Sequence, residues 1–269
     1  RLAFGPDAVA RMPDTPVDLV VTSPGWRPVQ PLLAAAAAAG IPVWGEVELA
    51  WRMRPEHGGA PWLAVTGTNG KTTTVQMLTS ILRAAGLRAC SAGNVGTPIL
   101  EAVVHPDPFD VIAVELSSFQ LHWSHSLAPQ ASVCLNVAPD HVDWHGSLEE
   151  YALAKGKVYA NTEVACIYNV QDERTRRLVE EADVQEGCRA VGFTLDLPAV
   201  SEVGLVGDVL ADRAFVEQRR TAAAELATLD DLANGDPPPA PHLVANALAA
   251  AAVARAHGVP AGAVRAGLR

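Results

Sequence analysis

Short apolar runs alternate with longer helical patterns along most of the chain. Each predicted strand is short and apolar and leads into turn residues or polar side chains. Strands are predicted at residues 17–22, 41–44, 62–66, 109–114, 131–137 and 164–168. Helices are predicted at residues 29–39, 46–53, 70–85, 147–161, 242–257 and 261–269. Strands that alternate with helices are typical of βαβ units, so we predict an α/β fold with a parallel sheet.

Three stretches depart from this alternation. Residues 55–61 (PEHGGAP) predict a linker and residues 236–241 (DPPPAP) predict a loop, because both are rich in proline. Residues 195–233 carry short apolar runs between glycines, which predicts a β-rich excursion. Ser147 and Glu150 have the spacing of a capping box, in which each side chain bonds the other's backbone N–H at a helix start.

Composition and charge exclude several classes of function. The chain has 269 residues and a formal net charge of −10, which disfavours nucleic-acid binding because a duplex would repel it. The uncharged run that would best suggest a membrane span, residues 28–43, contains Gln30 and several prolines, so it predicts a surface helix and no membrane insertion. The four cysteines are widely spaced without a CxxC pair, so neither a zinc knuckle nor a disulfide scaffold is indicated. We therefore expect a soluble, cytoplasmic protein of one or two domains.

Lysine is nearly absent from the chain. Lys71, Lys155 and Lys157 are the three lysines, against seventeen arginines. Arginine cannot deprotonate or replace a compact amine, so each remaining lysine is a candidate for chemistry. The chain also starts at Arg1 without a methionine and stops inside a predicted helix, so we expect a fragment.

The most specific chemical signal is AVTGTNGKTTT at residues 64–74. A strand that leads through a glycine-bearing loop into a helix presents backbone N–H groups that cradle phosphate oxygens. Lys71 is placed to neutralise β- and γ-phosphates, and the Thr72 hydroxyl to face Mg²⁺. Val65 stands where a strict Walker A motif has glycine, and the alternative interpretation is a glycine turn that precedes a helix by chance.

Two later strands also end in polar residues. In DVIAVELSSFQ (110–120) the strand ends near Glu115, whose carboxylate would complete a magnesium shell; alone, such a residue is usually a solvated surface carboxylate. In LNVAPDHVDWH (135–145) the strand ends in a cluster that suggests a metal-adjacent role, or a capped loop with incidental histidines. That cluster consists of Asn136, Asp140, His141, Asp143 and His145.

Lys155 lies in the helical segment YALAKGKVY. An ammonium cannot bind Mg²⁺, so a metal role would require the charge to be inverted, for example by carbamylation, which needs a neutral amine and a lowered pKa. The local alternative is a solvated surface cation. The Ser23–Gly25 turn, the 67–71 loop, Glu115 and His141 all follow predicted strands, and open parallel sheets bind ligands along that edge.

These segments resemble the Mur ligase family, which builds the peptide of peptidoglycan. The matching motifs occur in the family's order and together extend from about residue 22 to residue 246. They are TGTNGKTTT, GNVGTP (93–98), ELSSFQL (115–121), NVAPDHVDWHGS (136–147) and LAKGKVY (153–159). ELSSFQL, with TSPG upstream, indicates the branch that adds D-glutamate.

The resemblance implies the fold and the activity. Residues 1–55 would be part of a Rossmann-like domain that binds the UDP substrate, and residues 56–269 a three-layer, parallel-sheet P-loop ATPase domain. The implied enzyme is an ATP-dependent amide ligase for cell-wall synthesis that joins D-glutamate to UDP-N-acetylmuramoyl-L-alanine through an acyl phosphate. Family members have three domains, of which this chain would hold part of the first and none of the third, so we expect the chain alone to be inactive. The expected oligomeric state is a monomer.

The resemblance also assigns roles motif by motif. ATP contacts fall on Gly67, Thr68, Asn69, Gly70, Lys71, Thr72, Thr73 and Asn246. Substrate contacts fall on Ser23, Gly25, Asn94, Ser117 and Gln120. The implied catalytic residues are Lys71, His141 and Lys155. Thr72 and Glu115 would hold one Mg²⁺, and His141 with carbamylated Lys155 the second.

One motif departs from the family pattern, and three other functions stay open. Leu243 replaces the first asparagine of the family's H-N-x-x-N helix start, so the resemblance does not extend to that part of the adenine contact. His242 and Asn246 also fit simple helix capping. A folylpolyglutamate-synthase-like ligase shares the ATPase domain. A P-loop NTPase module without ligase activity, or a fragment that only binds nucleotide, would carry the same phosphate loop.

Overall fold

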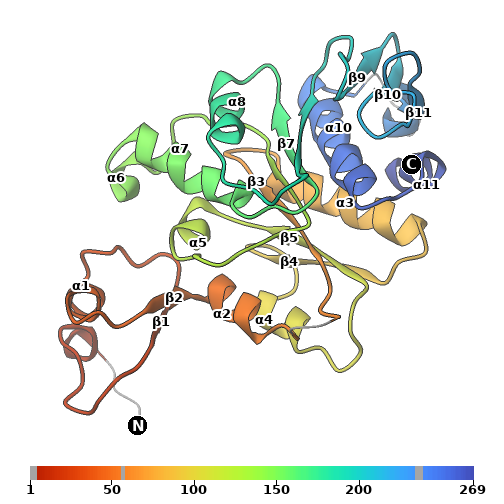
Figure 1. Cartoon of the computed structure of the whole chain (residues 1–269). Coiled ribbons are helices and arrows are strands. Elements are labelled where there is room, and N and C mark those ends of the chain that lie inside the picture. Colours follow the sequence, from red (N-terminus) through yellow and green to blue (C-terminus); the bar gives the residue numbers. More distant parts are fainter. Residues whose placement is uncertain (1–4, 56–57, 234–238) are drawn as a thin grey trace.

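A large sheet and a small one organise the molecule. The structure is a computed structural model, and it describes residues 5–55, 58–233 and 239–269 (Figure 1). The large sheet has the order β11-β10-β9-β8-β7-β6-β3-β5-β4. The strands from β4 to β9 in this order are parallel, whereas β10 (Val209–Asp212) runs antiparallel to β9 and to β11 (Ala224–Thr228). The parallel strands are β3 (Trp62–Thr66), β4 (Ala89–Gly93), β5 (Val111–Glu115), β6 (Ala131–Cys134), β7 (Ala165–Asn169), β8 (Arg189–Phe193) and β9 (Glu202–Val206).

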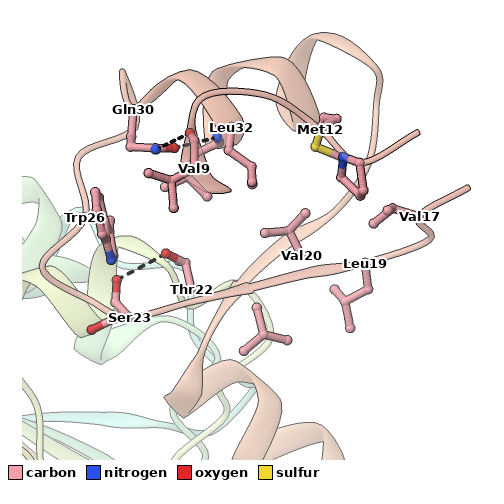
Figure 2. Close-up of a pocket in the computed structure, with 13 residues that line it drawn as sticks. Val9, Met12, Val17, Leu19, Val20, Thr22, Ser23, Trp26, Gln30 and Leu32 are labelled. Carbon is pink, nitrogen blue, oxygen red and sulfur yellow. Dashed lines mark hydrogen bonds between the residues drawn. The ribbon is translucent and has the colours of Figure 1, made fainter. Parts of the chain in front are cut away.

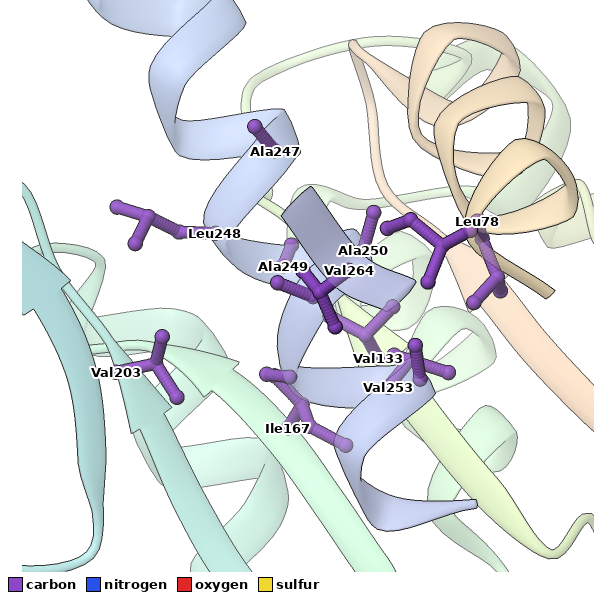
Figure 3. Close-up of a cluster of buried hydrophobic side chains, with 14 of the residues drawn as sticks. Leu78, Val133, Ile167, Val203, Ala247, Leu248, Ala249, Ala250, Val253 and Val264 are labelled. Atoms are coloured by element: carbon purple, nitrogen blue, oxygen red, sulfur yellow. The ribbon is translucent and has the colours of Figure 1, made fainter. Parts of the chain in front are cut away.

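One face of the large sheet is covered by α3 (Lys71–Ala84), α10 (Pro241–Ala256) and α11 (Ala261–Leu268). In α10 nearly every residue from Val244 to Ala254 is buried, which is typical of a helix that is apolar all round. Figure 3 shows its alanines between the strands and α3. Small side chains let α10 lie close to the sheet while α3 packs against it.

The other face is covered by shorter helices, which complete a three-layer arrangement. They are α2 (Glu46–Met53), α4 (Ile99–Val103), α5 (Ser118–His122), α7 (Leu148–Gly156), the 3₁₀ helix η2 (Lys157–Tyr159) and α8 (Glu173–Glu180). The core on this face contains large side chains such as Trp62, Tyr151 and Tyr159. Because α7 and η2 are anchored by this core, the end of α7 that carries Lys155 is held against the sheet.

The small sheet pairs β1 (Val20–Thr22) with β2 (Val43–Gly45) in parallel, next to η1 (Pro6–Val9) and α1 (Pro31–Ala38). The helix that follows β2, α2, buries Val47 and Ala50 in the core of the large sheet. The division of the chain at residue 55 stays a prediction. None of the helices in the described part of the chain has the length and apolar character that crossing a bilayer requires.

The predicted α/β fold with a parallel sheet is confirmed, and so is the β-rich excursion, which forms β9, β10 and β11. β4 and β8 were not predicted, because their small or charged residues (ACSAG and RAVGF) hide the strand pattern. The helices α4, α5, α8, α6 (Val142–His145) and α9 (Leu229–Ala233) were not predicted either. The strand predicted at 131–137 ends at Cys134, and the helix predicted at 147–161 ends at Gly156 and continues as η2. Part of each proline-rich stretch, residues 56–57 and 236–238, lies outside the described residues.

Candidate functional site

The loop between β3 and α3 takes a conformation that requires its glycines. Gly67 has a φ of 155° and Gly70 a φ of 85°, and the αL conformation of Gly70 forms the N-cap of α3. A Cβ atom on Gly70 would collide with the side-chain amide of Asn246 on α10. The backbone N–H groups of Gly70, Lys71 and Thr72 have no acceptor within the described residues. They form a donor cluster at a helix N-terminus, which suits a phosphate group.

Two lysine side chains meet at this loop. The Nζ of Lys71 donates to the carbonyls of Gly67 (2.9 Å) and Thr68 (3.0 Å), and the Nζ of Lys155 donates to the same Gly67 carbonyl (2.8 Å). Burial lowers the pKa of both amines, that of Lys155 to about 8. Neither forms an ion pair with a carboxylate in the part of the chain that the structure describes. Two cations at one carbonyl make this site attractive to an anion.

A buried carboxylate faces the start of α3. Glu115 is 1% exposed, and its two oxygens accept from the Thr72 hydroxyl and from the Asn94 side-chain amide, both at 3.0 Å. The loop after β4 therefore brings Asn94 to the ends of β3 and β5. A carboxylate beside a threonine hydroxyl is an all-oxygen donor set of the kind that Mg²⁺ prefers.

His141 lies apart from this pair. It is exposed, has a φ of 47°, and its ring centroid is 4.8 Å from that of Phe119. Its Nε2 is 3.4 Å from an oxygen of Asp140. Across the described residues, no three His, Cys, Asp or Glu side chains converge as in a preformed metal centre. The structure thus connects Thr72, Glu115 and Asn94 by hydrogen bonds, whereas His141 is exposed and, in the described part of the chain, makes no hydrogen bond to any of the three.

The predicted substrate residues Ser117 and Gln120 form a complete capping box at the start of α5. The side-chain Oε1 of Gln120 accepts from the Ser117 backbone N–H (2.9 Å), and its Nε2 donates to the Glu46 carboxylate (2.9 Å). At the capping box predicted from the sequence, Ser147 accepts from the Glu150 N–H (3.0 Å), whereas the described residues show no return bond from Glu150. Gln120 is 2% exposed, so its amide already has partners inside the chain.

The turn at Ser23 and Gly25 approaches the same region from the small sheet. The Gly25 carbonyl accepts from the Trp144 indole N–H (3.1 Å) on α6 (Val142–His145), and Arg27 pairs with Asp143 (2.9 Å). On its other side, Ser23 lines an apolar cavity of about 400 Å³ (Figure 2). The turn therefore contacts α6, the short helix that directly follows His141, and the described residues show no hydrogen bond from it to the phosphate loop.

Tyr151 is a site residue that the sequence analysis missed. Its hydroxyl lies 3.1 Å from the Thr68 Oγ1, and its ring centroid is 4.6 Å from the Nζ of Lys155. The available signal was its position four residues before Lys155, which places both on one face of α7. Tyr151 thus connects the phosphate loop with the lysine helix.

Comparison with known families identifies relatives of this chain. Residues 65–254 match the family described as Mur ligase middle domain. The chain is 62% identical to the UDP-N-acetylmuramoylalanine–D-glutamate ligase of Streptomyces avermitilis over 252 residues, which are 94% of this chain and 53% of that protein. It is 51% identical to the ligase of the same name from Leifsonia xyli over 275 residues, 98% of this chain and 51% of that protein. The chain spans about half the length of the curated relatives it matches.

Solved structures of lower identity share the fold. One is UDP-N-acetylmuramate:L-alanyl-γ-D-glutamyl-meso-diaminopimelate ligase from Neisseria meningitidis, with a TM-score of 0.60 and 17% identity over 93% of this chain and 78% of that one. Another is UDP-N-acetylmuramate–alanine ligase from Thermotoga maritima, with a TM-score of 0.53 and 21% identity over 93% of this chain and 54% of that one. At such identities the likeness concerns the fold alone.

Proposed function

Because this chain belongs to the Mur ligase family, we propose that it supplies the ATP-binding part of a ligase that joins D-glutamate to UDP-N-acetylmuramoyl-L-alanine. The observation that carries the proposal is the meeting of Lys71 and Lys155 at the Gly67 carbonyl, beside the Glu115–Thr72 pair. The relatives named as D-glutamate ligases support the choice of amino acid. Peptidoglycan precursor synthesis in the cytoplasm and a monomeric state are parts of the same proposal.

Charge stabilisation is the main task of these residues. In phosphoryl transfer, catalysis consists mostly of positioning and electrostatics. The free N–H groups at residues 70–72 and the ammonium of Lys71 would bind the nucleotide phosphates. They would stabilise charge as the substrate carboxylate takes the γ-phosphoryl group and ADP leaves. Attack by the amine of D-glutamate on the resulting acyl phosphate then forms the amide and releases phosphate.

The donor set at Glu115 suits magnesium. Both of its hydrogen-bond donors are neutral side chains, and no Lys or Arg forms an ion pair with it among the described residues, so acceptor positions of this buried carboxylate remain for a cation. Thr72 and Glu115 would hold one Mg²⁺, and His141 with modified Lys155 a second. When bound, Mg²⁺ neutralises charge on the phosphates, while Asn94 and Thr72 orient the carboxylate.

Carbamylation of Lys155 is the second part of the proposal. Burial lowers the pKa of Lys155 to about 8, so a substantial share of the amine is neutral near that pH. The neutral amine adds CO₂ and releases a proton, which converts a cation into an anionic carbamate. With carbon-13 bicarbonate, NMR should show a carbamate signal that is lost in Lys155→Arg and kept in the matched control Lys157→Arg. A signal that survives in Lys155→Arg would contradict the assignment.

The ligase proposal is tested by ADP release. The assay uses a form of the protein extended to the length of its relatives, with UDP-N-acetylmuramoyl-L-alanine and Mg-ATP, with and without D-glutamate. Release should require both substrates and should fall about 10³-fold in Lys71→Ala, a loss typical of a key transition-state donor. The exposed Lys157→Ala serves as the control and should retain turnover.

The other outcomes separate the alternatives. Release that is indifferent to both substrates would support an NTPase module, and turnover with a folate acceptor would support a folylpolyglutamate-synthase-like ligase. We expect the 269-residue chain alone to be inactive, because it spans only about half the length of its relatives. Rapid turnover by that chain would overturn this expectation.

A further inference from the structure

Asn136, a side chain without a role in the chemistry proposed above, is bonded to the phosphate loop. It lies two residues after β6, and its Oδ1 accepts from the backbone N–H of Asn69 at 2.9 Å. Its Nδ2 donates back to the Asn69 carbonyl at 3.0 Å. The Asn136 carbonyl also accepts from the Thr68 N–H at 3.0 Å. One residue thus occupies both polar backbone groups of Asn69 and the N–H of Thr68.

The segment that carries Asn136 is itself fixed on both sides. On the side of the phosphate loop, Thr68 Oγ1 accepts from the Ala138 N–H (3.0 Å), which adds a contact next to those of Asn136. On the far side, the Val137 N–H donates to Asp172 (2.8 Å), whose other oxygen caps α8 through the Arg174 N–H (3.0 Å). The loop after β6 is therefore a rigid support between α8 and the phosphate loop, and it continues directly into His141.

Asn136 accepts hydrogen bonds from only some of the backbone N–H groups of the phosphate loop. The N–H groups of Thr68 and Asn69 are consumed by Asn136, whereas those of Gly70, Lys71 and Thr72 have no acceptor in the described chain. Without the Asn136 side chain, Asn69 would lose two partners, and the loop could rotate its peptide groups. The Gly67 carbonyl, on which Lys71 and Lys155 converge, lies two residues before Asn69 in the same loop.

We propose that Asn136 is a positioning residue that holds the phosphate loop in its nucleotide-binding conformation and couples it to the His141 segment. This inference rests on the proposed function, because the ligand of the loop is taken to be Mg-ATP. Asparagine suits the role because its side-chain amide has a donor and an acceptor side by side, which can bond the N–H and the carbonyl of Asn69 together. An ionised aspartate keeps the acceptor and turns the donor into a second acceptor that faces the Asn69 carbonyl.

The test measures loop protection and nucleotide affinity separately. Asn136→Ala and Asn136→Asp are made in the extended form used for the ADP assay. Asn169→Ala is the matched control, because Asn169 also bonds this segment, through the Leu135 carbonyl (3.2 Å), but does not touch the phosphate loop. Amide hydrogen exchange is read over residues 66–73 without ligand, and the Kd for Mg-ATP is measured by calorimetry.

We expect faster exchange in the loop and a Kd for Mg-ATP raised roughly 10- to 30-fold in Asn136→Ala, the size expected for two lost hydrogen bonds. Asn169→Ala should change neither quantity. In Asn136→Asp, a protonated carboxyl group regains a donor, and an aspartate has an ordinary pKa of about 3.9. The ratio of its Kd to that of the wild type should therefore fall as the pH is lowered from 6 towards 4.5. A merely structural loss would not recover in this way.

Each contrary result has a distinct meaning. Unchanged exchange in Asn136→Ala would overturn the inference whatever ATP does. Faster exchange with an unchanged Kd would also overturn it, because the loop would then bind nucleotide without the support. If the wild type does not bind Mg-ATP, the proposed function fails, and the exchange measurement alone decides whether Asn136 positions the loop.

Discussion

Two buried glutamates show how the same side chain serves different ends in two regions of the molecule. Glu48 on α2 is fully buried where this helix meets the loop after α5. Its carboxylate accepts from Arg52 (2.6 Å), from the Ser126 hydroxyl (2.7 Å) and from the backbone N–H groups of His125 (2.8 Å) and Ser126 (3.0 Å). Burial alone would raise the pKa of Glu48, but these hydrogen bonds outweigh it and lower the pKa.

Glu115 at the end of β5 is almost equally buried but has far fewer partners. It receives one hydrogen bond from Thr72 and one from Asn94, with no backbone N–H and no cation among the described residues. A carboxylate has about four acceptor positions, so Glu48 is saturated and Glu115 is not. The comparison indicates that Glu48 joins two parts of the structure, whereas Glu115 keeps capacity for a ligand.

The largest effect should come from removing the charge of Glu115. In the extended form, Glu115→Gln should reduce ligand-dependent ADP release about 10³-fold, because the carboxylate is the negative group that would hold Mg²⁺ beside the phosphates. Its unfolding free energy should change little, since a glutamine can still accept from Thr72. The matched control is Glu48→Gln, which should retain turnover. Full turnover in Glu115→Gln would contradict the difference drawn between the two residues.

The closeness of the phosphate loop and Glu115 could be predicted from the sequence, because it depends on patterns within short segments. Lys71 and Thr72 follow the glycine loop directly, and Glu115 ends a strongly apolar strand, so local pattern sufficed to place them at one sheet edge. The Glu48–His125 and Glu46–Gln120 contacts join residues 77 and 74 positions apart. Such pairings depend on how α2 docks against α5, which periodicity cannot reveal.

The same limit applies to strands and loops. β4 (ACSAG) is held in the sheet by pairing with β5, and its own residues carry little strand signal. The contacts of Asn136 also come from the neighbouring strand order β6-β3, which sets two loops side by side. Tertiary pairing overrides local propensity at each of these positions.

A smaller effect, on stability, should follow from Glu48→Gln. The change leaves the N–H groups of His125 and Ser126 with a single neutral acceptor, and it removes the partner of Arg52. We expect the unfolding free energy at pH 7 to fall by about 2–3 kcal/mol, since Arg52 is half-exposed and its ion pair is partly screened. Urea unfolding measures the loss, and Glu115→Gln is the control that should stay within about 1 kcal/mol of the wild type.

The pH dependence of that loss distinguishes a charged hydrogen-bonded carboxylate from a simple packing defect. The pKa of Glu48 is lowered in the folded protein, so between its folded and unfolded values the unfolded chain binds more protons. The stability that Glu48 contributes is therefore present above its ordinary pKa, near about 4.3, and is lost as the pH falls through the folded value. The gap between the wild type and Glu48→Gln should narrow as the pH falls from 6 towards 3.5. If the difference in unfolding free energy stays constant over this range, the charge of Glu48 does not contribute to stability. Glu48 and Glu115 would then differ only in the number of hydrogen bonds that they accept.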